Sequence, residues 1–166
     1  MDKKYLFIFA LIVDVLLINS CSKSDNSGST NDKPFDTEEA RKEIDEANRE
    51  FINLFNRSDS VGLANMFTVD GKSMEPNEPS FNGRSQIQTH YSVVMKAGAN
   101  KLGLLTTGLW GNENMLAEEG KYTFMNNDDK ELDRGKYIVL WKKENGEWKL
   151  FRDCYNSDLL IPSASN

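Results

Sequence analysis

One acidic side chain lies in an otherwise apolar row of the sequence and could do acid–base chemistry. In the stretch 115–125 apolar and polar residues alternate, and the side chains of a strand alternate between its two faces. One face therefore holds Leu116, Glu118, Gly120, Tyr122 and Phe124. A carboxyl group in such surroundings either acts as a general acid or base or is paired with a cation.

The cation for such a pair is expected on the last strand-like segment, 147–156. Alternation places Arg152 in one row with Trp148, Leu150, Cys154 and Asn156, and Asp153 in the opposite row with Phe151 and Tyr155. Arg152 is therefore a candidate partner for Glu118, in either a functional or a buried structural ion pair. Asp153 is expected on the other sheet face or in a dimer contact, and Cys154 is expected as a small buried hydrophobe.

The remaining candidates are one histidine and several aromatic residues. His90 is the only histidine, and it lies at the edge of the apolar stripe of an expected helix at 84–97. It is either a pocket acid, base or donor, or a packing residue. Four aromatic side chains are either pocket wall or ordinary core: Tyr91, Trp110, Tyr122 and Trp141. The sequence contains no metal-binding cluster, phosphate loop or nucleophile motif, so no metal and no cofactor are expected.

Composition limits the class of protein. The 166 residues are 39% apolar and 28% charged, with 4 prolines, which is typical of one compact domain. The formal net charge is -6 and the sequence pI is about 4.9, so the phosphates of a nucleic acid would be repelled. We therefore expect no nucleic-acid partner.

The first 20 residues have the three parts of a secretory signal. A basic start at 3–4 precedes an apolar centre at 5–18, which is too short to span a bilayer. The stretch Leu17-Ile18-Asn19-Ser20-Cys21 resembles the lipobox of bacterial lipoproteins, whose cysteine carries fatty acyl chains such as palmitate. The resemblance implies a lipid anchor at Cys21, in the bacterial cell envelope at the outer membrane. The alternative is an ordinary secreted protein with a free Cys21.

The next part of the chain is polar and then helical. Residues 21–35 lack apolar periodicity and are expected to form a flexible tether. Asp36 and Glu39 have the spacing of an N-cap pairing, and they begin an amphipathic helix of about 20 residues. A short second helix is expected to end near Phe67, before a turn at Asp70-Gly71.

After the third helix the period becomes that of strands. Strands are expected at about 102–110, 115–125, 132–143 and 147–156, and Asn145-Gly146 is a strong hairpin signal between the last two. Helices followed by such a meander predict an α+β domain over 36–158, with the helices on one face of an antiparallel sheet. Residues 159–166 are expected to form a tail.

The order of these elements and four segments resemble the nuclear transport factor 2-like (NTF2-like) superfamily. Within it the nearest resemblance is to SnoaL-like, ketosteroid-isomerase-like domains of unknown function. The segments are Phe51 to Asp59, Met66 to Gly71, Asn82 to Ile87 and Trp148 to Asp153. The resemblance covers nearly all of residues 36–158. It implies a cone in which a curved sheet wraps three helices, with a pocket at the open end and frequent homodimers through the sheet.

The resemblance to ketosteroid isomerase also implies positions for a catalytic base and two oxyanion donors. The base position corresponds to Glu75, which precedes Pro76. The donor tyrosine corresponds to Phe51, and the donor acid lies near Leu140. Both donors are thus absent from those positions, and loss of one such donor typically costs about 10² to 10³ in rate. Steroid-type isomerisation by that mechanism is not expected.

Two functions follow from the sequence. The first is a membrane-anchored domain without established catalysis, which binds a small, partly apolar molecule or a protein partner. The second is an isomerase, cyclase or dehydratase with a pocket carboxylate, Glu75 or Glu118, as general base. In that case His90, Tyr91 or Arg152 would support the base. The sequence leaves open whether the protein is an enzyme.

Overall fold

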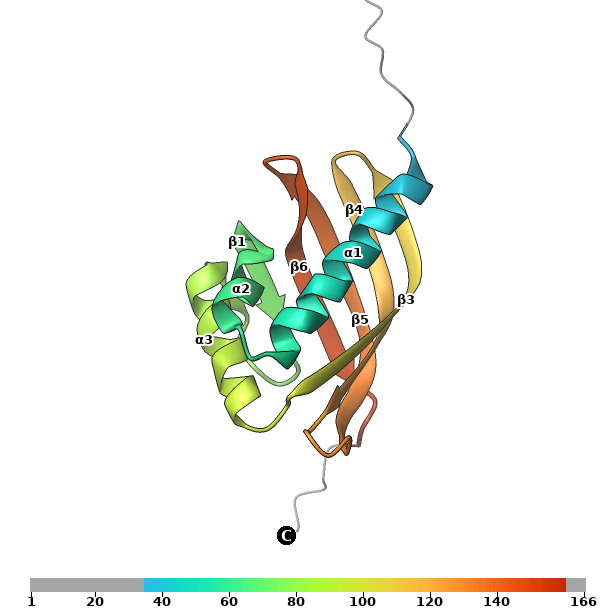
Figure 1. Ribbon diagram of the computed structural model, residues 1–166. Helices are drawn as coiled ribbons and strands as arrows, with labels where there is room; N and C mark the ends of the chain where they lie inside the picture. The colour runs from blue at the N-terminus through green and yellow to red at the C-terminus, as the bar shows by residue number, and fades with distance from the viewer. Residues whose placement is uncertain (1–34, 161–166) are drawn as a thin grey trace, which may run out of the picture. The chain divides into compact units, whose positions relative to one another are not determined.

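The computed structural model describes residues 35–160, which fold as one unit that begins with a long helix (Figure 1). Helix α1 is Thr37–Asn56, α2 is Ser60–Asn65 and α3 is Gly83–Lys96. The predicted N-cap is confirmed, because Asp36 Oδ1 accepts hydrogen bonds from the backbone N–H groups of Glu38 and Glu39 at 3.1 and 3.0 Å. No helix of the described residues is long and apolar enough to span a membrane.

The sheet has six strands in the order β2-β1-β6-β5-β4-β3. The strands are β1 Phe67–Met74, β2 Phe81–Asn82, β3 Lys101–Asn112, β4 Met115–Met125, β5 Glu131–Glu144 and β6 Glu147–Ser157. Neighbouring strands are antiparallel except β1 and β6, which run parallel. The α+β class is thus confirmed, but the sheet is mixed. The sequence did not predict β1, because buried and exposed residues do not alternate along this strand. The alternation is broken by a register shift between Phe67 and Lys72 in the pairing with β6.

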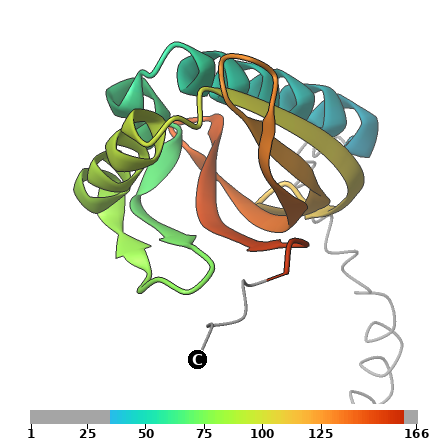
Figure 2. The ribbon, with the colours of Figure 1, turned by 90° about the horizontal axis from the view of Figure 1, so that it is seen from below.

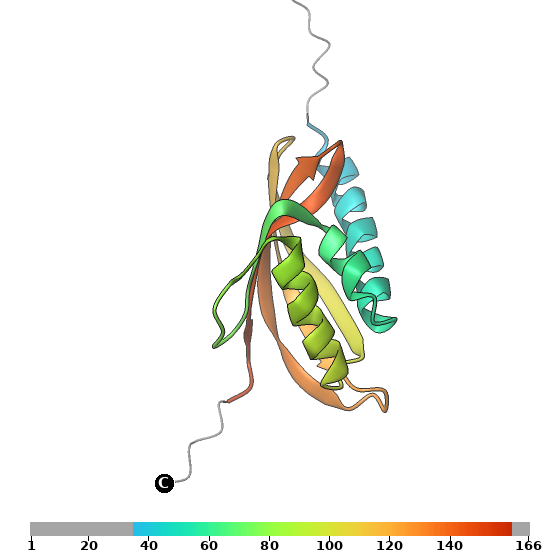
Figure 3. The same cartoon turned by 90° about the vertical axis from the view of Figure 1, so that its left-hand side faces the viewer.

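The helices cover one face of the sheet, and the sheet curls around them (Figures 2 and 3). Helix α1 packs on β3, while α3 packs on β1 and α2. The apolar stripe of α1 supplies core residues at helical spacing, among them Ile44, Phe51 and Phe55. Each such fully buried side chain contributes about 1.5–3 kcal/mol relative to exposure. The core therefore lies between the helices and the concave face of the sheet.

A bulge in β6 decides which side chains reach that concave face. Trp141 pairs with Leu150 and Leu140 pairs with Arg152, so Phe151 is an extra residue in the ladder. The extra residue reverses the alternation beyond it. Asp153 consequently faces the core and is 7% exposed, while Cys154 is exposed. The predictions that Asp153 faces outward and that Cys154 is buried are therefore wrong.

The predicted hairpin at Asn145-Gly146 is confirmed. Both residues have positive φ, 56° and 86°. Two-residue hairpin loops of type I′ need positive φ at both positions, because the twist of the turn then matches the right-handed twist of the strands. The predictions for the signal peptide, for Cys21 and for most of the tether fall on residues outside the described range. Of the predicted tail at 159–166, the structure describes residues 159 and 160.

Candidate functional site

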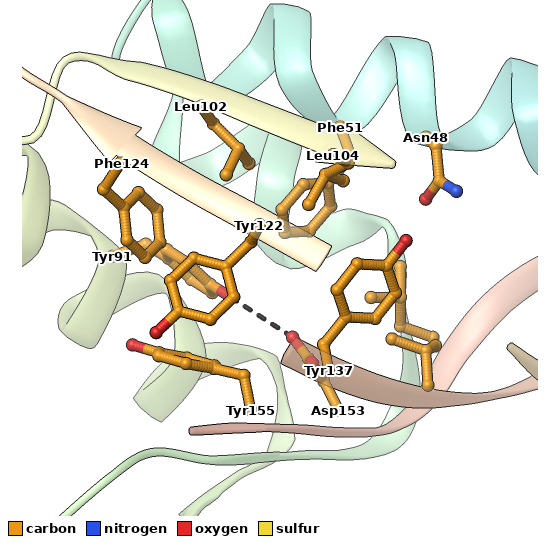
Figure 4. Close-up of a pocket in the computed structure, with 12 residues that line it drawn as sticks. Asn48, Phe51, Tyr91, Leu102, Leu104, Tyr122, Phe124, Tyr137, Asp153 and Tyr155 are labelled. Atoms are coloured by element: carbon orange, nitrogen blue, oxygen red, sulfur yellow. Dashed lines mark hydrogen bonds between the residues drawn. The ribbon is translucent and has the colours of Figure 1, made fainter. Parts of the chain in front are cut away.

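A small cavity lies between α1, α3 and the concave face of the sheet (Figure 4). Its volume is about 50 Å³. At about 10–15 Å³ for each water position this is room for roughly three to five waters. The cavity is lined by Asn48, Phe51, Tyr91, Leu102, Leu104, Tyr122, Phe124, Tyr137, Val139, Leu150, Asp153 and Tyr155. The wall is therefore mostly aromatic and aliphatic, with a single carboxyl group.

That carboxyl group belongs to Asp153 and is paired with a phenol. The hydroxyl of Tyr91 donates to Asp153 Oδ2 over 3.4 Å, and Figure 4 shows this contact crossing the cavity. Burial, followed by the negative charge of Glu75, raises the pKa of Asp153 to about 8. Burial, and then the charge of Asp153, also raises the pKa of Tyr91 well above its usual value. At neutral pH both groups are protonated, and while Tyr91 donates to Asp153, the protonated carboxyl group can give a hydrogen bond to a ligand.

Glu75 and His90 lie together behind this pair and do not line the cavity. The Glu75 side chain is 2% exposed, and His90 Nε2 lies 3.4 Å from Glu75 Oε1. The hydroxyl of Ser73 donates to the same oxygen at 2.5 Å, and the His90 ring stacks on Phe81 with centroids 4.1 Å apart. Within the described part of the chain, Glu75 Oε2 and His90 Nε2 have no hydrogen-bond partner. Glu75 and His90 thus lie in one cluster, and the negative charge of Glu75 helps to raise the pKa of Asp153.

Glu118 is fully buried, and neutral donors hold it. Its Oε1 accepts from Asn48 Nδ2 at 2.7 Å, from the Thr106 hydroxyl at 2.6 Å and from the Tyr137 hydroxyl at 2.7 Å. Its Oε2 accepts from Trp141 Nε1 at 2.8 Å. With four bonds in place, the carboxylate has little capacity left for a substrate proton. Its arrangement is that of a structural centre which ties α1 to β3, β4 and β5.

The expected pair of Glu118 with Arg152 is wrong. Arg152 Nη1 donates to the carbonyl oxygens of Phe151 and Asp70 at 2.6 and 3.1 Å, and its guanidinium lies 3.7 Å from the Phe151 ring centroid. The bulge at Phe151 is the reason, because it turns Arg152 away from the core and brings Asp153 in. Arg152 is therefore not a residue of the cavity.

The four aromatic candidates separate into three positions. Tyr91 and Tyr122 line the cavity. Trp141 is fully buried beside Glu118 and contributes to the core. Trp110 is 55% exposed, so the expectation that it forms pocket wall or core is wrong. A second register shift, between Thr106 and Gly108 of β3, precedes Trp110 and sets its direction.

Sequence reasoning missed four polar residues of the site. Asn48 lies within the apolar stripe of α1, four residues after Ile44, and this position was a usable signal. Tyr137 alternates with Val139 and Trp141 along β5, which was a second signal. Asp153 and Tyr155 had no such signal, because the bulge shifts their alternation.

Comparison with solved structures identifies the fold. A ketosteroid isomerase-like protein from Erwinia carotovora atroseptica matches with a TM-score of 0.61 at 19% identity, over 70% of this chain and 95% of that one. An NTF2-like protein with a cystatin-like fold from Novosphingobium aromaticivorans matches with a TM-score of 0.61 at 14% identity, over 77% and 86%. A putative scytalone dehydratase from the same organism matches with a TM-score of 0.62 at 11% identity, over 74% and 87%.

Sequence comparison adds nothing to this result. No protein-family model and no curated protein matches the sequence. At such low sequence identities the structural matches show the fold alone. Proteins that share a fold often have unrelated activities. The resemblance predicted from the sequence is confirmed at that level. This chain has the NTF2-like, or cystatin-like, α+β fold, with a small cavity inside the curve of its sheet.

Proposed function

We propose that this protein binds a small, partly apolar molecule in the cavity around Asp153, and that a lipid on Cys21 anchors it in the bacterial cell envelope. The observation that supports binding is the cavity wall, in which aromatic rings surround one buried carboxyl group that no cationic side chain of the described residues neutralises. Ligand sites are usually concave and apolar, with few polar groups that fix orientation. The cavity volume restricts the ligand to a compact molecule.

Filling the cavity is expected to abolish binding. Leu104 lines the cavity, whereas its neighbour Leu105 is 62% exposed on the other sheet face. In the Leu104→Trp variant the indole should occupy the cavity, while Leu105→Trp adds the same ring outside it. We would incubate the full-length protein with a defined mixture of small alcohols, ketones, amines and carboxylic acids, and identify retained molecules by native mass spectrometry.

The wild type and Leu105→Trp should retain the same molecule, and Leu104→Trp should retain at least about ten-fold less of it. Overpacking of a core typically costs about 1–3 kcal/mol, so thermal denaturation must show that Leu104→Trp is folded at the assay temperature. If the wild type retains nothing, or if folded Leu104→Trp retains as much as the wild type, the binding proposal is rejected.

A second candidate function is proton transfer, and the raised pKa of Asp153 favours it. The pKa of Asp153, about 8, lies close to a neutral working pH, and a pKa near the working pH suits a general base. The hydroxyl of Tyr91, 3.4 Å away, could donate to an oxygen on which negative charge develops. This arrangement differs from the one that the resemblance implied, because the base is Asp153 of β6 and not Glu75, and the donor is Tyr91 and not a residue at position 51.

Exchange of α-hydrogens in a small ketone tests this second function. We expect the protein to speed deuterium uptake by cyclopentanone in D₂O, with a rate that rises with pH and levels off above about 8, since only ionised Asp153 is a base. Asp153→Asn should lower the rate by about 10² or more. Asp128→Asn makes the same change in an exposed turn and should leave the rate unchanged. An equal rate in Asp153→Asn would exclude Asp153 as the base.

The anchor has its own test. The Cys21→Ser variant lacks the lipobox thiol that acylation would use, so incorporation of labelled palmitate should fall to background. The protein should then leave the membrane fraction, because stable attachment needs acyl chains on this residue. Cys154→Ser, which removes the exposed thiol of β6, is the matched control and should keep the label. Label that persists in Cys21→Ser would contradict the anchor.

A further inference from the structure

The walls of the cavity are aromatic rings set at steep angles to one another. Tyr122 and Tyr155 pack edge to face with centroids 4.9 Å apart and an interplanar angle of 71°. Phe124 and Tyr155 make a similar contact at 68°, and Phe51 and Tyr91 make one at 83°. Such a set of rings forms walls rather than a stack. The negative faces of aromatic rings attract cations within about 6 Å of their centroids.

The interior behind these rings holds acids and no strong base. Among the described residues the buried charged side chains are Glu75, Glu118 and Asp153. No lysine, arginine or histidine belongs to the lining of the cavity. Glu118 is satisfied by neutral donors, but Asp153 has only the long contact from Tyr91. Buried carboxylates are normally paired with a cation, and within residues 35–160 no cationic side chain pairs with Asp153.

We propose that the molecule bound in this cavity is a small organic ammonium ion, held between the rings and the carboxylate of Asp153. This inference rests on the proposed binding function and adds the chemical class of the ligand. Figure 4 shows the carboxyl group of Asp153 pointing into the space beside Tyr122, with Tyr137 and Tyr155 on either side. A cation in that space would lie beside aromatic rings and beside a carboxyl group that carries a full charge once its proton is released.

Other ligand classes fit these walls less well. An anion would meet Asp153 and the charges of Glu75 and Glu118 without any cationic side chain in the lining. A metal ion needs several oxygen, nitrogen or sulfur ligands, and no cluster of three or more such acidic, histidine or cysteine side chains occurs in residues 35–160. A neutral apolar molecule would fit the rings but would leave Asp153 as it is. Of these classes, the ammonium ion is the one that uses the rings and the charge of ionised Asp153 together.

Binding of a permanent cation must release a proton from Asp153. The groups that face Asp153 are Tyr91 from α3, Glu75 beyond β1 and Glu118 from β4, and its charge also acts on Tyr137 and Tyr155 of β5 and β6. Among the described residues, the basic side chain within 4 Å of Glu75 is His90. Because Asp153 is protonated below pH 8, affinity for the cation should rise up to ten-fold for each pH unit and level off above about 8.

Choline and its uncharged analogue 3,3-dimethylbutan-1-ol provide the test, since they have nearly the same shape. We would measure both affinities for the full-length protein by isothermal titration calorimetry from pH 6 to pH 9, in buffers of different ionisation enthalpy. At pH 9 choline should bind at least about ten-fold more tightly than the alcohol. At pH 7 its binding should release close to one proton, whereas binding of the alcohol should release none.

Two variants separate the ligand class from the pocket itself. In Asp153→Asn the preference for choline should fall to less than about three-fold at every pH, while Asp128→Asn should keep it. Tyr155→Leu removes one ring without touching the acid and should also reduce the preference. If the alcohol binds as well as choline at pH 9, the ammonium proposal is overturned and the pocket stands. If neither compound binds, and the small-molecule mixture also yields nothing, the proposed function falls with it.

Discussion

Replacing Glu118 by alanine is expected to lower the free energy of unfolding by about 4 kcal/mol or more. The substitution leaves four donors without their acceptor, on buried Asn48, Tyr137 and Trp141 and on half-buried Thr106. Each unsatisfied buried group costs about 1–3 kcal/mol, and the vacated space adds a cavity cost. Since small domains have only about 5–15 kcal/mol of stability, the variant should be at the edge of folding.

Urea denaturation followed by tryptophan fluorescence measures this loss, because Trp141 itself contacts the carboxylate. The matched control is Glu119→Ala, the next residue of β4, which faces outward and is exposed. It should change stability by less than about 0.5 kcal/mol. Glu118→Gln keeps the volume but places an N–H₂ group toward one set of donors, so its loss should lie between those two. A loss below about 1 kcal/mol in Glu118→Ala would show that the donors find other acceptors and that Glu118 is not the centre of this network.

Replacing Asp153 by asparagine is expected to raise the free energy of unfolding, whereas Glu118→Ala lowers it. The usual aspartate pKa is 3.8, and in the folded protein the pKa is about 8, chiefly because of burial. The folded state therefore holds a proton that the unfolded chain releases. The stability that this group contributes is fully present below pH 4 and is lost as the pH rises to about 8. Asparagine removes this loss, and the gain at pH 7 is on the order of 4 kcal/mol.

The sign and the pH window are both measurable. The difference in unfolding free energy between Asp153→Asn and the wild type should be small at pH 4, grow with pH, and become constant above about 8. Asp128→Asn, in the exposed β4–β5 turn, should show no such trend. A difference that is constant from pH 4 to pH 9 would show that Asp153 titrates normally. A gain in stability from removing a functional acid is the expected sign of a site that trades stability for function.

The elements of the domain were largely predictable, because their signals are local. The capping geometry at Asp36, the helical spacing along α1, and the Asn145-Gly146 turn depend on residues close in sequence. Strand β4 alternates without interruption, and Glu118 was therefore placed on the correct face. Strand β1 was not predictable, since it is short, irregular and paired with a strand that lies far along the chain.

The site was less predictable than the fold, for a single geometric reason. Strict alternation along β6 predicts Arg152 inside and Asp153 outside, and the extra residue Phe151 inverts both. Whether a bulge forms depends on the pairing with β5, which one strand's sequence does not reveal. The partners of Glu118 were also hidden, because Asn48 lies on a helix and Trp141 on the adjacent strand, and only the folded sheet brings them together.

The position of β6 has a consequence for how the protein is made. This strand is the last of the domain to be synthesised, yet in the sheet it lies between β1 and β5. While residues 147–157 are still within the ribosome, β1 has no parallel partner and the concave face has a gap at its middle. Such non-local pairing is slow to form, because a long loop must close first. The nascent chain should therefore remain open until its final strand emerges, and the cavity, which needs Asp153 and Tyr155, should form at the end of folding.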